Sequence, residues 1–234
     1  MTTHQDVRPR APKQVGRRAV TRGAAWSIPV VSLAMAAPAM AVSGCTMTTG
    51  ALSWDVFGNG TKQTGKALAT TLAGVTVTVS VSGDTGAANN GEVTSATTGG
   101  LSKVLRFYDL NNKKDTSQTV TLTFSKPVQN LSFSLLDVDA QSGLLQNAYE
   151  DLVVVNTAGA SAHRHSNVKG AGTVADPYRA KNSNSPVSGA SADSNVDLSW
   201  TGPISSVSFT YKQDGSVSGN PFIGISDLSF QRCV

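Results

Sequence analysis

The chain has 234 residues, 15% of them charged and 6% aromatic, and its formal net charge is +4. Residues 1–41 hold six of the 19 Lys and Arg and one of the 15 Asp and Glu, which leaves 13 basic and 14 acidic residues, a net charge of −1, in residues 42–234. Because the positive charge is confined to the amino end, we expect no nucleic-acid partner for the rest of the chain.

The amino end has the three parts of an export signal. A basic region is followed by the uncharged run Gly23–Ala41, which ends in the small residues Ala39 and Ala41. This order is typical of a secretory signal, and a membrane-spanning helix is the alternative. Pro29 and Pro38 weaken the helix alternative. The sequence therefore predicts an export signal at residues 1–41 and an extracellular or cell-surface protein.

The leader also carries a resemblance. Gly16–Arg18, Gly23–Val31 and Ala36–Ala41 resemble the leader of secreted surface proteins of high-GC Gram-positive bacteria. The arginine pair resembles a twin-arginine export signal, although Thr21 stands where a second apolar residue is usual. The general secretory route is the alternative. The resemblance implies export and no particular activity.

Two cysteines, Cys45 and Cys233, lie near the two ends of the exported part. In an oxidising compartment they are expected to form a disulfide that places the first and last strands side by side. The alternative is that Val42–Cys45 is a lipobox. Cys45 would then carry a lipid that tethers the protein to the membrane, and Cys233 would be a free thiol.

The stretch Thr119–Asp139 predicts a β-hairpin. Apolar residues alternate with Thr and Ser from Thr119 to Ser125 and again from Leu131 to Leu135, which is the pattern of half-buried strands. Lys126–Asn130 interrupts the alternation with a proline and an asparagine, so we expect a turn there.

Further segments predict about ten strands in all and no helix; most of them alternate, and Tyr149–Val155 is apolar enough to be covered on both faces. The expected strands outside the hairpin are Leu52–Val56, Val75–Val81, Val104–Leu110, Tyr149–Val155, Val196–Trp200, Val207–Tyr211 and Phe222–Phe230. This pattern predicts an all-β fold, a two-sheet antiparallel β-sandwich that is jelly-roll-like, as a single domain at residues 42–234.

A second resemblance concerns the exported part. Phe124–Phe133, Leu136–Asp139 and Tyr149–Val153 resemble a pattern of bacterial cell-surface β-sandwich modules. The resemblance implies a fold and a location but no reaction.

Carboxylates near the end of the expected hairpin are candidates for a metal site. Asp137 and Asp139 are two residues apart and share a strand face, and Asp151 follows on the next expected strand. Converging carboxylates suit calcium, which is the candidate cofactor at this site. The alternative is that they accept hydrogen bonds from loop backbone.

Other candidate sites are weaker. His163 and His165 would share a strand face and could hold zinc, but the sequence offers no third ligand, and exposed histidines without a metal are favoured. Tyr149 and Tyr178, near loops, are the candidate stacking platforms for a sugar. Asp137 with Asp151 could serve a hydrolase, but the sequence has no recognised catalytic motif.

These observations predict an exported, non-catalytic protein with a structural or adhesive role at the cell surface or in the medium. Its expected partner is a cell-wall or extracellular glycan or another surface protein, and membrane contact is expected only through the export signal or a lipid on Cys45. The alternatives are a carbohydrate-binding module with a structural calcium and a hydrolase of unknown substrate.

Overall fold

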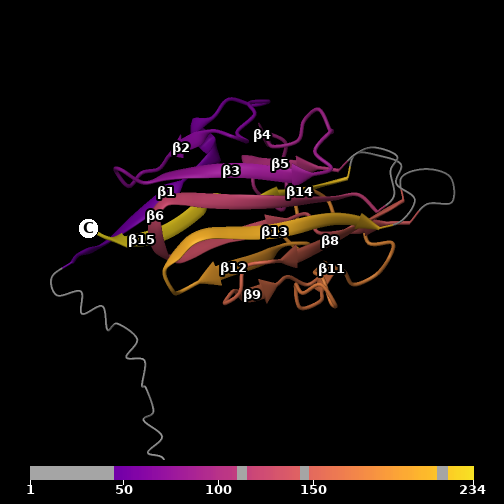
Figure 1. Cartoon of the computed structure of the whole chain (residues 1–234). Helices are drawn as coiled ribbons and strands as arrows, with labels where there is room; N and C mark the ends of the chain where they lie inside the picture. Colours follow the sequence, from indigo (N-terminus) through magenta and orange to yellow (C-terminus); the bar gives the residue numbers. More distant parts are fainter. Residues whose placement is uncertain (1–44, 110–114, 143–147, 215–220) are drawn as a thin grey trace, which may run out of the picture. The chain divides into compact units, whose positions relative to one another are not determined.

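The computed structural model describes residues 45–109, 115–142, 148–214 and 221–234. The predicted export signal and the lipobox residues Val42–Gly44 lie outside the described residues. The described chain consists of β-strands, loops and one short 3-10 helix, and all pairings between its strands are antiparallel. The all-β prediction is therefore confirmed (Figure 1). No helix among these residues is long and apolar enough to cross a membrane.

Strand β6 (Ser117–Leu136) belongs to both layers of the sandwich. Its first half pairs with β3 (Thr76–Gly83) on one side and β13 (Ile204–Asp214) on the other, and Figure 1 shows it lying between them. Its second half pairs with a different set of strands, β12 (Val196–Trp200), β14 (Phe222–Ile225) and β15 (Leu228–Cys233). One long strand thus connects the two layers, so the thirteen strands linked by these pairings form one curled sheet folded on itself.

The remaining strands extend these two layers. The first layer also contains β2 (Ala67–Ala69), β7 (Ala140–Gln141) and β8 (Tyr149–Val155). The second layer also contains β1 (Met47–Leu52), β4 (Glu92–Thr94), β5 (Val104–Tyr108) and β9 (Ser161–Arg164). A separate two-stranded sheet is formed by β10 (Val168–Lys169) and β11 (Arg179–Ala180).

The predicted hairpin at Thr119–Asp139 is wrong, because β6 runs straight through the expected turn. Residues 124–127 lie where the register against β13 shifts, between the Thr123–Ser206 and Val128–Ile204 pairs. Pro127 therefore removes no ladder hydrogen bond from that pairing. Asn130 has a positive φ of 49°, and the buried positions change there from even-numbered to odd-numbered residues. The polar interruption is the place where the strand changes layers.

The 3-10 helix η1 (Trp54–Val56) also departs from prediction, because Leu52–Val56 was expected to be one strand. The backbone N–H of Trp54 donates to Oδ1 of Asp227, and its indole N–H donates to the Ser226 carbonyl, both at 2.8 Å. Ser226 and Asp227 also divide the expected strand Phe222–Phe230 into β14 and β15. The Ser226 carbonyl and the Asp227 carboxylate thus hold the buried Trp54 at this break, while the Ser226 N–H still donates to the Ser134 carbonyl of β6.

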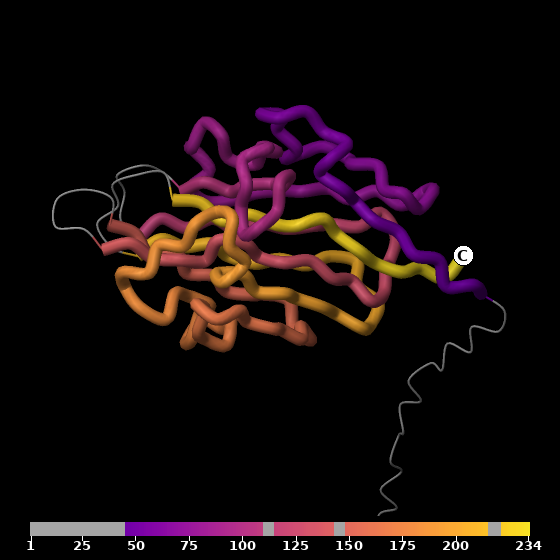
Figure 2. The backbone as a smooth tube through the Cα atoms, turned by 180° about the vertical axis from the view of Figure 1, so that it is seen from behind, coloured from indigo at the N-terminus to yellow at the C-terminus, as the bar shows by residue number. Residues whose placement is uncertain are grey.

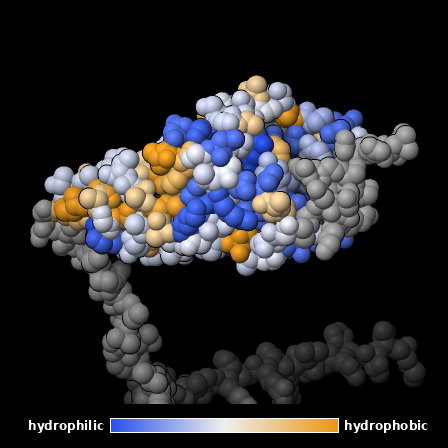
Figure 3. Space-filling model, turned by 90° about the horizontal axis from the view of Figure 1, so that it is seen from above, coloured by the Kyte–Doolittle hydropathy of each residue, from blue (hydrophilic) through white to orange (hydrophobic). Residues whose placement is uncertain are grey.

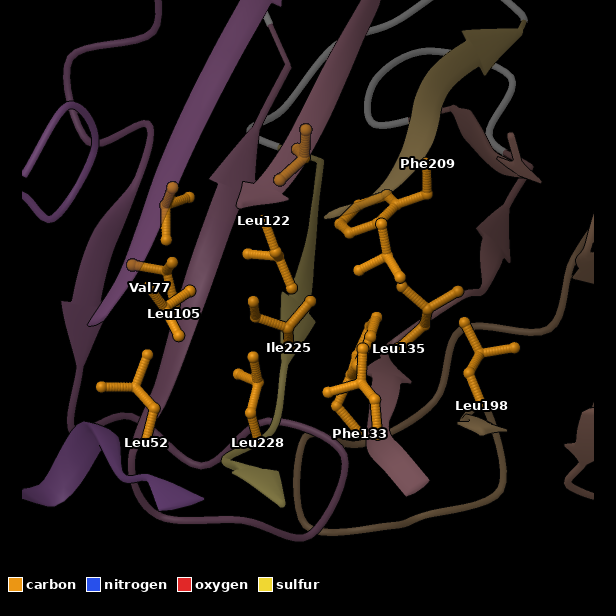
Figure 4. Packing of buried hydrophobic residues seen from close by; sticks show 14 of the residues in the cluster. Leu52, Val77, Leu105, Leu122, Phe133, Leu135, Leu198, Phe209, Ile225 and Leu228 are labelled. Atoms are coloured by element: carbon orange, nitrogen blue, oxygen red, sulfur yellow. The ribbon is translucent and has the colours of Figure 1, made fainter. Parts of the chain in front are cut away.

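The core lies between the layers. Phe107 of β5 packs edge-on against Phe209 of β13, with ring centroids 6.0 Å apart, and these strands belong to different layers. Figure 4 shows the apolar side chains filling the space between the strands, among them Leu52, Leu122 and Phe133. Burial of this continuous apolar set is the main force that holds the two layers together.

The described chain begins and ends on neighbouring strands. Residues of β1 and β15 pair from Met47–Cys233 to Leu52–Leu228, and Thr46 and Val234 exchange two backbone hydrogen bonds of 3.2 and 3.1 Å. Figure 2 shows the first strand running beside the last, up to the carboxyl end. The expected adjacency of the first and last strands is present.

The surface outside the core is mixed. The face seen in Figure 3 carries hydrophilic residues across its middle and hydrophobic residues gathered toward one end. The large apolar side chains that are most exposed, Val56 and Val174, come from separate segments of the chain. Single exposed apolar residues of this kind are ordinary in folded proteins.

Candidate functional site

The disulfide closes the domain at one end. Cys45 and Cys233 are bonded, with their Cα atoms 5.4 Å apart. Pairing of β1 with β15 brings the two residues together, since Cys233 lies opposite Met47 at the end of the ladder. The predicted disulfide is present, and a lipid on the sulfur of Cys45 does not fit this bond. No free cysteine occurs among the described residues.

The predicted calcium ligands lie where β6 ends and β7 and β8 pair. Asp139 precedes β7, and Asp151 points inward from β8. The backbone N–H of Asp151 donates to the Asp139 carbonyl at 3.0 Å, and the backbone N–H of Asp139 donates to Oδ2 of Asp151 at 3.3 Å. Asp137 has a left-handed backbone, φ 66°, and its N–H donates to the side chain of Asn195. The structure brings the three residues into one region of the fold.

Protein donors already engage the carboxylates of Asp139 and Asp151. Oδ2 of Asp139 accepts the Val187 backbone N–H at 2.6 Å, and its carboxylate also hydrogen-bonds the Tyr149 hydroxyl. Oδ1 of Asp151 accepts the Tyr211 hydroxyl at 2.7 Å and a short bond from the Gln213 amide. These bonds link two strands and a loop. They match the alternative to calcium binding, in which the acids accept hydrogen bonds from the loop backbone.

Burial changes the acidity of this aspartate cluster. It raises the pKa of Asp137 to about 7, an effect that the neighbouring Asp139 reinforces and Arg106 opposes. Burial likewise raises the pKa values of Asp139 and Asp151, and the charge of Asp139 adds to the effect on Asp151. The cluster therefore retains protons at pH values where aspartates in water have lost them.

Calcium at Asp137, Asp139 and Asp151 stays a prediction. In the described part of the chain, these three side chains do not form a group of His, Cys, Asp or Glu ligand atoms within 4.8 Å of one another. A calcium ion takes six to eight oxygen ligands, so it would need backbone and water oxygens in addition.

Of the two candidate tyrosines, Tyr178 does not resemble a sugar platform, and the role of Tyr149 stays a prediction. Tyr178 is 4% exposed, and its backbone exchanges two 2.9 Å hydrogen bonds with Val153, so its ring is part of the core. Tyr149 is half-buried with its hydroxyl on Asp139. Stacking on a sugar requires an exposed ring face, which Tyr178 lacks.

The structure supplies a third polar residue beside the two histidines. Strand β9 pairs with β12 so that His163 lies opposite Asp197, and the backbone N–H of His165 donates to the Asn195 carbonyl. Nε2 of His165 is 3.0 Å from Oδ2 of Asp197, and the two imidazole rings are 5.2 Å apart. His163, His165 and Asp197, the His-His-Asp cluster, have one ligand atom each within 4.8 Å of the others.

Sequence reasoning named both histidines but missed Asp197. The alternation Val196–Leu198–Trp200 does place Asp197 on the outer face of its strand. The identity of the neighbouring strand, however, is set by the fold and not by a local pattern.

Neither a protein-family model, nor a curated protein, nor a solved structure matches the chain. What the protein does must therefore be argued from its own residues.

Proposed function

We propose that this is an exported, non-catalytic β-sandwich with a structural or adhesive role at the cell surface or in the medium. The observation that carries the proposal is the Cys45–Cys233 disulfide between the first and last strands. Disulfides of this structural kind persist in oxidising compartments outside the cytosol. The basic and apolar segment at residues 1–41 has the composition of the signal that such a route requires.

The position of the disulfide suits a module that is held under tension. The bond spans 188 residues of sequence, so nearly all of the sandwich lies inside the covalent loop. A force applied between the two chain ends would pass through the Cys45–Cys233 bond, and the strands inside the loop would bear little of it. A surface or adhesive protein benefits from this arrangement.

The state of the buried acids supports a structural role over hydrolysis. Of the candidate hydrolase pair Asp137 and Asp151, Asp137 is half-buried, and Asp151 is 1% exposed with its carboxylate engaged by the Tyr211 hydroxyl and the Gln213 amide. A carboxylate pair that hydrolyses a glycosidic bond must instead face the substrate. The proposed partner is a cell-wall or extracellular glycan or another surface protein.

Export and oxidation can be tested together. The full chain, with its own leader, is expressed in a Gram-positive bacterial host, and the medium, wall, membrane and cytosol are analysed by non-reducing mass spectrometry. We expect a product that starts near residue 42, found outside the cytosol, with a mass lower by two hydrogens than that of the reduced chain. An uncleaved, reduced chain confined to the cytosol would refute the proposal.

Two further measurements address the route and the role. Replacement of Arg17 and Arg18 by Lys should stop export if the twin-arginine route is used and should leave it unchanged if the general route is used.

A glycan array and a whole-cell adhesion assay, each with and without calcium, then separate an adhesive role from a calcium-dependent sugar-binding module. Only the latter loses its signal on chelation.

A further inference from the structure

We infer that the His-His-Asp cluster is a zinc-binding site on the outer face of the second layer. This inference goes beyond the proposed function and does not depend on where the protein resides. It begins from the strand register, because three strands each contribute one residue to a single cross-strand row. His163 of β9 lies opposite Asp197 of β12, which in turn lies opposite Ser134 of β6.

The row places the donors on one surface. Residues directly opposite each other in an antiparallel pair point to the same face, and His165 is two residues from His163 and shares that face. On β12 the flanking Val196 and Leu198 are buried while Asp197 is 47% exposed, so the row faces outward. His165 is 28% exposed, and His163 is exposed. All three groups can be reached by an ion from solution.

The donor types and distances fit zinc. Two imidazole nitrogens and one carboxylate oxygen form a donor set that zinc accepts readily and calcium does not. In a tetrahedral zinc site, donors at their usual bond lengths are about 3.3 Å apart. The separation of 3.0 Å between His165 and Asp197 is within a few tenths of that value, and zinc would replace the proton that they share. A small rotation of the exposed His163 completes the set.

Neighbouring residues support Asp197 as a ligand. The Ser134 hydroxyl donates to Oδ1 of Asp197 at 2.6 Å, which fixes the carboxylate and leaves Oδ2 directed at His165. Burial raises the pKa of Asp197, but the hydrogen bonds from Ser134 and His165 outweigh it, and the net effect lowers this pKa. An orienting hydrogen bond to a ligating carboxylate is a regular feature of metal sites.

The electrostatic surroundings also favour a cation. Asp193, in the loop before β12, accepts hydrogen bonds from the hydroxyls of Ser166 and Ser191, which lower its pKa, and its charge interacts with His165. The nearest basic residue in sequence, Arg164, donates to the Gly170 carbonyl at 2.7 Å. Its place in sequence between His163 and His165 directs it to the opposite face from theirs.

A hollow beside the cluster leaves room for a fourth ligand. It has a volume of about 310 Å³ and is lined by His163, Asp197 and the neighbouring cross-strand row Ser161–Ser199–Ser132. Three protein ligands with an open position are typical of zinc sites that bind water or an external ligand. The site is therefore expected to hold zinc with a water molecule, and that water could be exchanged for a carboxylate or imidazole of a partner.

Zinc binding is tested by isothermal titration of the full, oxidised chain after chelator treatment. We expect saturable binding of one zinc ion per chain that excess calcium does not displace. Cobalt used in place of zinc should give the visible absorption of a tetrahedral site. The chain has three histidines in all, so His4→Ala is the matched control for His163→Ala and His165→Ala.

We expect each of His163→Ala and His165→Ala to weaken zinc binding at least tenfold and Ser134→Ala to weaken it by about tenfold. His4→Ala and Asp55→Asn, an exposed acid outside the site, should leave it unchanged. Circular dichroism without metal checks that every variant retains its strands, which is expected because the two histidines are not core residues. Absence of saturable binding at millimolar zinc would overturn the inference, and so would binding that survives in the double variant of His163 and His165.

Discussion

Asp137 shows how a single side chain couples this fold to pH. Its left-handed backbone, φ 66°, ends β6, and burial raises its pKa from 3.8 to about 7. Between these two pH values the folded chain binds a proton that the unfolded chain has lost. In this range the folded state binds more protons than the unfolded state. The free energy of unfolding must therefore fall as pH rises, because a lower proton concentration favours the state that binds fewer protons.

Replacement of Asp137 by Asn should remove this contribution. Asn has a similar shape, cannot ionise, and tolerates a left-handed backbone. We expect Asp137→Asn to match the parent chain near pH 4 and to exceed its free energy of unfolding at pH 7.5 by roughly 2 kcal/mol, a discounted value for a partly solvated group. Urea unfolding at several pH values measures the difference. Asp55→Asn is the control, and equal differences at pH 4 and pH 7.5 would contradict the prediction.

Arg106 is a nearly buried cation at 8% exposure, held by neutral partners. Its guanidinium donates to the Thr98 hydroxyl, the Tyr108 hydroxyl and the Ala96 carbonyl, and its Cζ atom lies 4.0 Å above the Phe222 ring. A lysine has one ammonium group and cannot make these divergent bonds and the ring contact together.

We therefore expect Arg106→Lys to lower the free energy of unfolding by about 1–3 kcal/mol, because buried hydroxyl and carbonyl acceptors lose their donor. Chemical denaturation at pH 7 checks this value. Arg164→Lys, at an exposed arginine with one backbone acceptor, is the control and should be nearly neutral. Equal stability of the two variants would show that the network around Arg106 adds little.

At the scale of elements, local alternation predicted strands well and connections poorly. Strands β8 and β12 have the expected bounds. In β12 the apolar residues recur at every second position, whereas β8 was recognised by its short continuous apolar run. The wrong hairpin prediction at β6 has a simple reason. A proline and an asparagine interrupt the apolar alternation both at a hairpin turn and at a point where one strand changes layers. Sequence alone does not show whether the chain reverses or continues, because that depends on the partners of each half.

The candidate sites show the same limit. The aspartate cluster was predictable in outline, because Asp137 and Asp139 follow β6 directly and Asp151 is close to them in sequence, on β8. The His-His-Asp cluster was not, because the segment that contains β10 and β11 separates Asp197 from His163 in sequence, and the two residues meet only through the β9–β12 pairing. Burial of Tyr178 was missed for a similar reason: its segment looked like a loop, whereas it packs against Val153.

The change of layer in β6 leads to a prediction at Asn130. The residue has φ 49°, and its insertion into the alternation moves the buried side chains from Phe124 and Val128 to Leu131 and Phe133. A β-branched residue is strained at positive φ, whereas glycine is not. We expect Asn130→Val to lower the free energy of unfolding by about 1–2 kcal/mol relative to Asn130→Gly.

The glycine variant is the matched control for Asn130, because both substitutions lose the side-chain bond that Asn130 donates to Gln231 at 2.7 Å. The difference between them therefore reports backbone strain alone, apart from the small difference in unfolded-state entropy. Thermal and urea unfolding of the two variants give the measurement. A valine variant as stable as the glycine variant would mean that the backbone at Asn130 relaxes without cost to the fold.

At the scale of the molecule, the disulfide encloses nearly all of the strand topology, and this should affect stability. The first and last strands are neighbours, so almost every pairing in the sandwich is formed by residues within the loop that Cys45 and Cys233 close. Many of these pairings join segments distant in sequence, such as β1 with β15 and β3 with β6. Forming them requires an unfolded chain to give up much conformational entropy.

A covalent link between the chain ends reduces that entropy before folding begins. For a loop of 188 residues the chain-entropy model gives about 5 kcal/mol. We expect Cys45→Ser, Cys233→Ser and the double variant to lose similar amounts of unfolding free energy, up to this value, because each abolishes the same bond. Urea unfolding with and without reductant measures it, and the parent chain with reductant should match the double variant. If reductant left the midpoint of the parent chain unchanged, the disulfide would contribute nothing to stability, and the β1–β15 ladder and the core would have to hold the ends of the sandwich together without it.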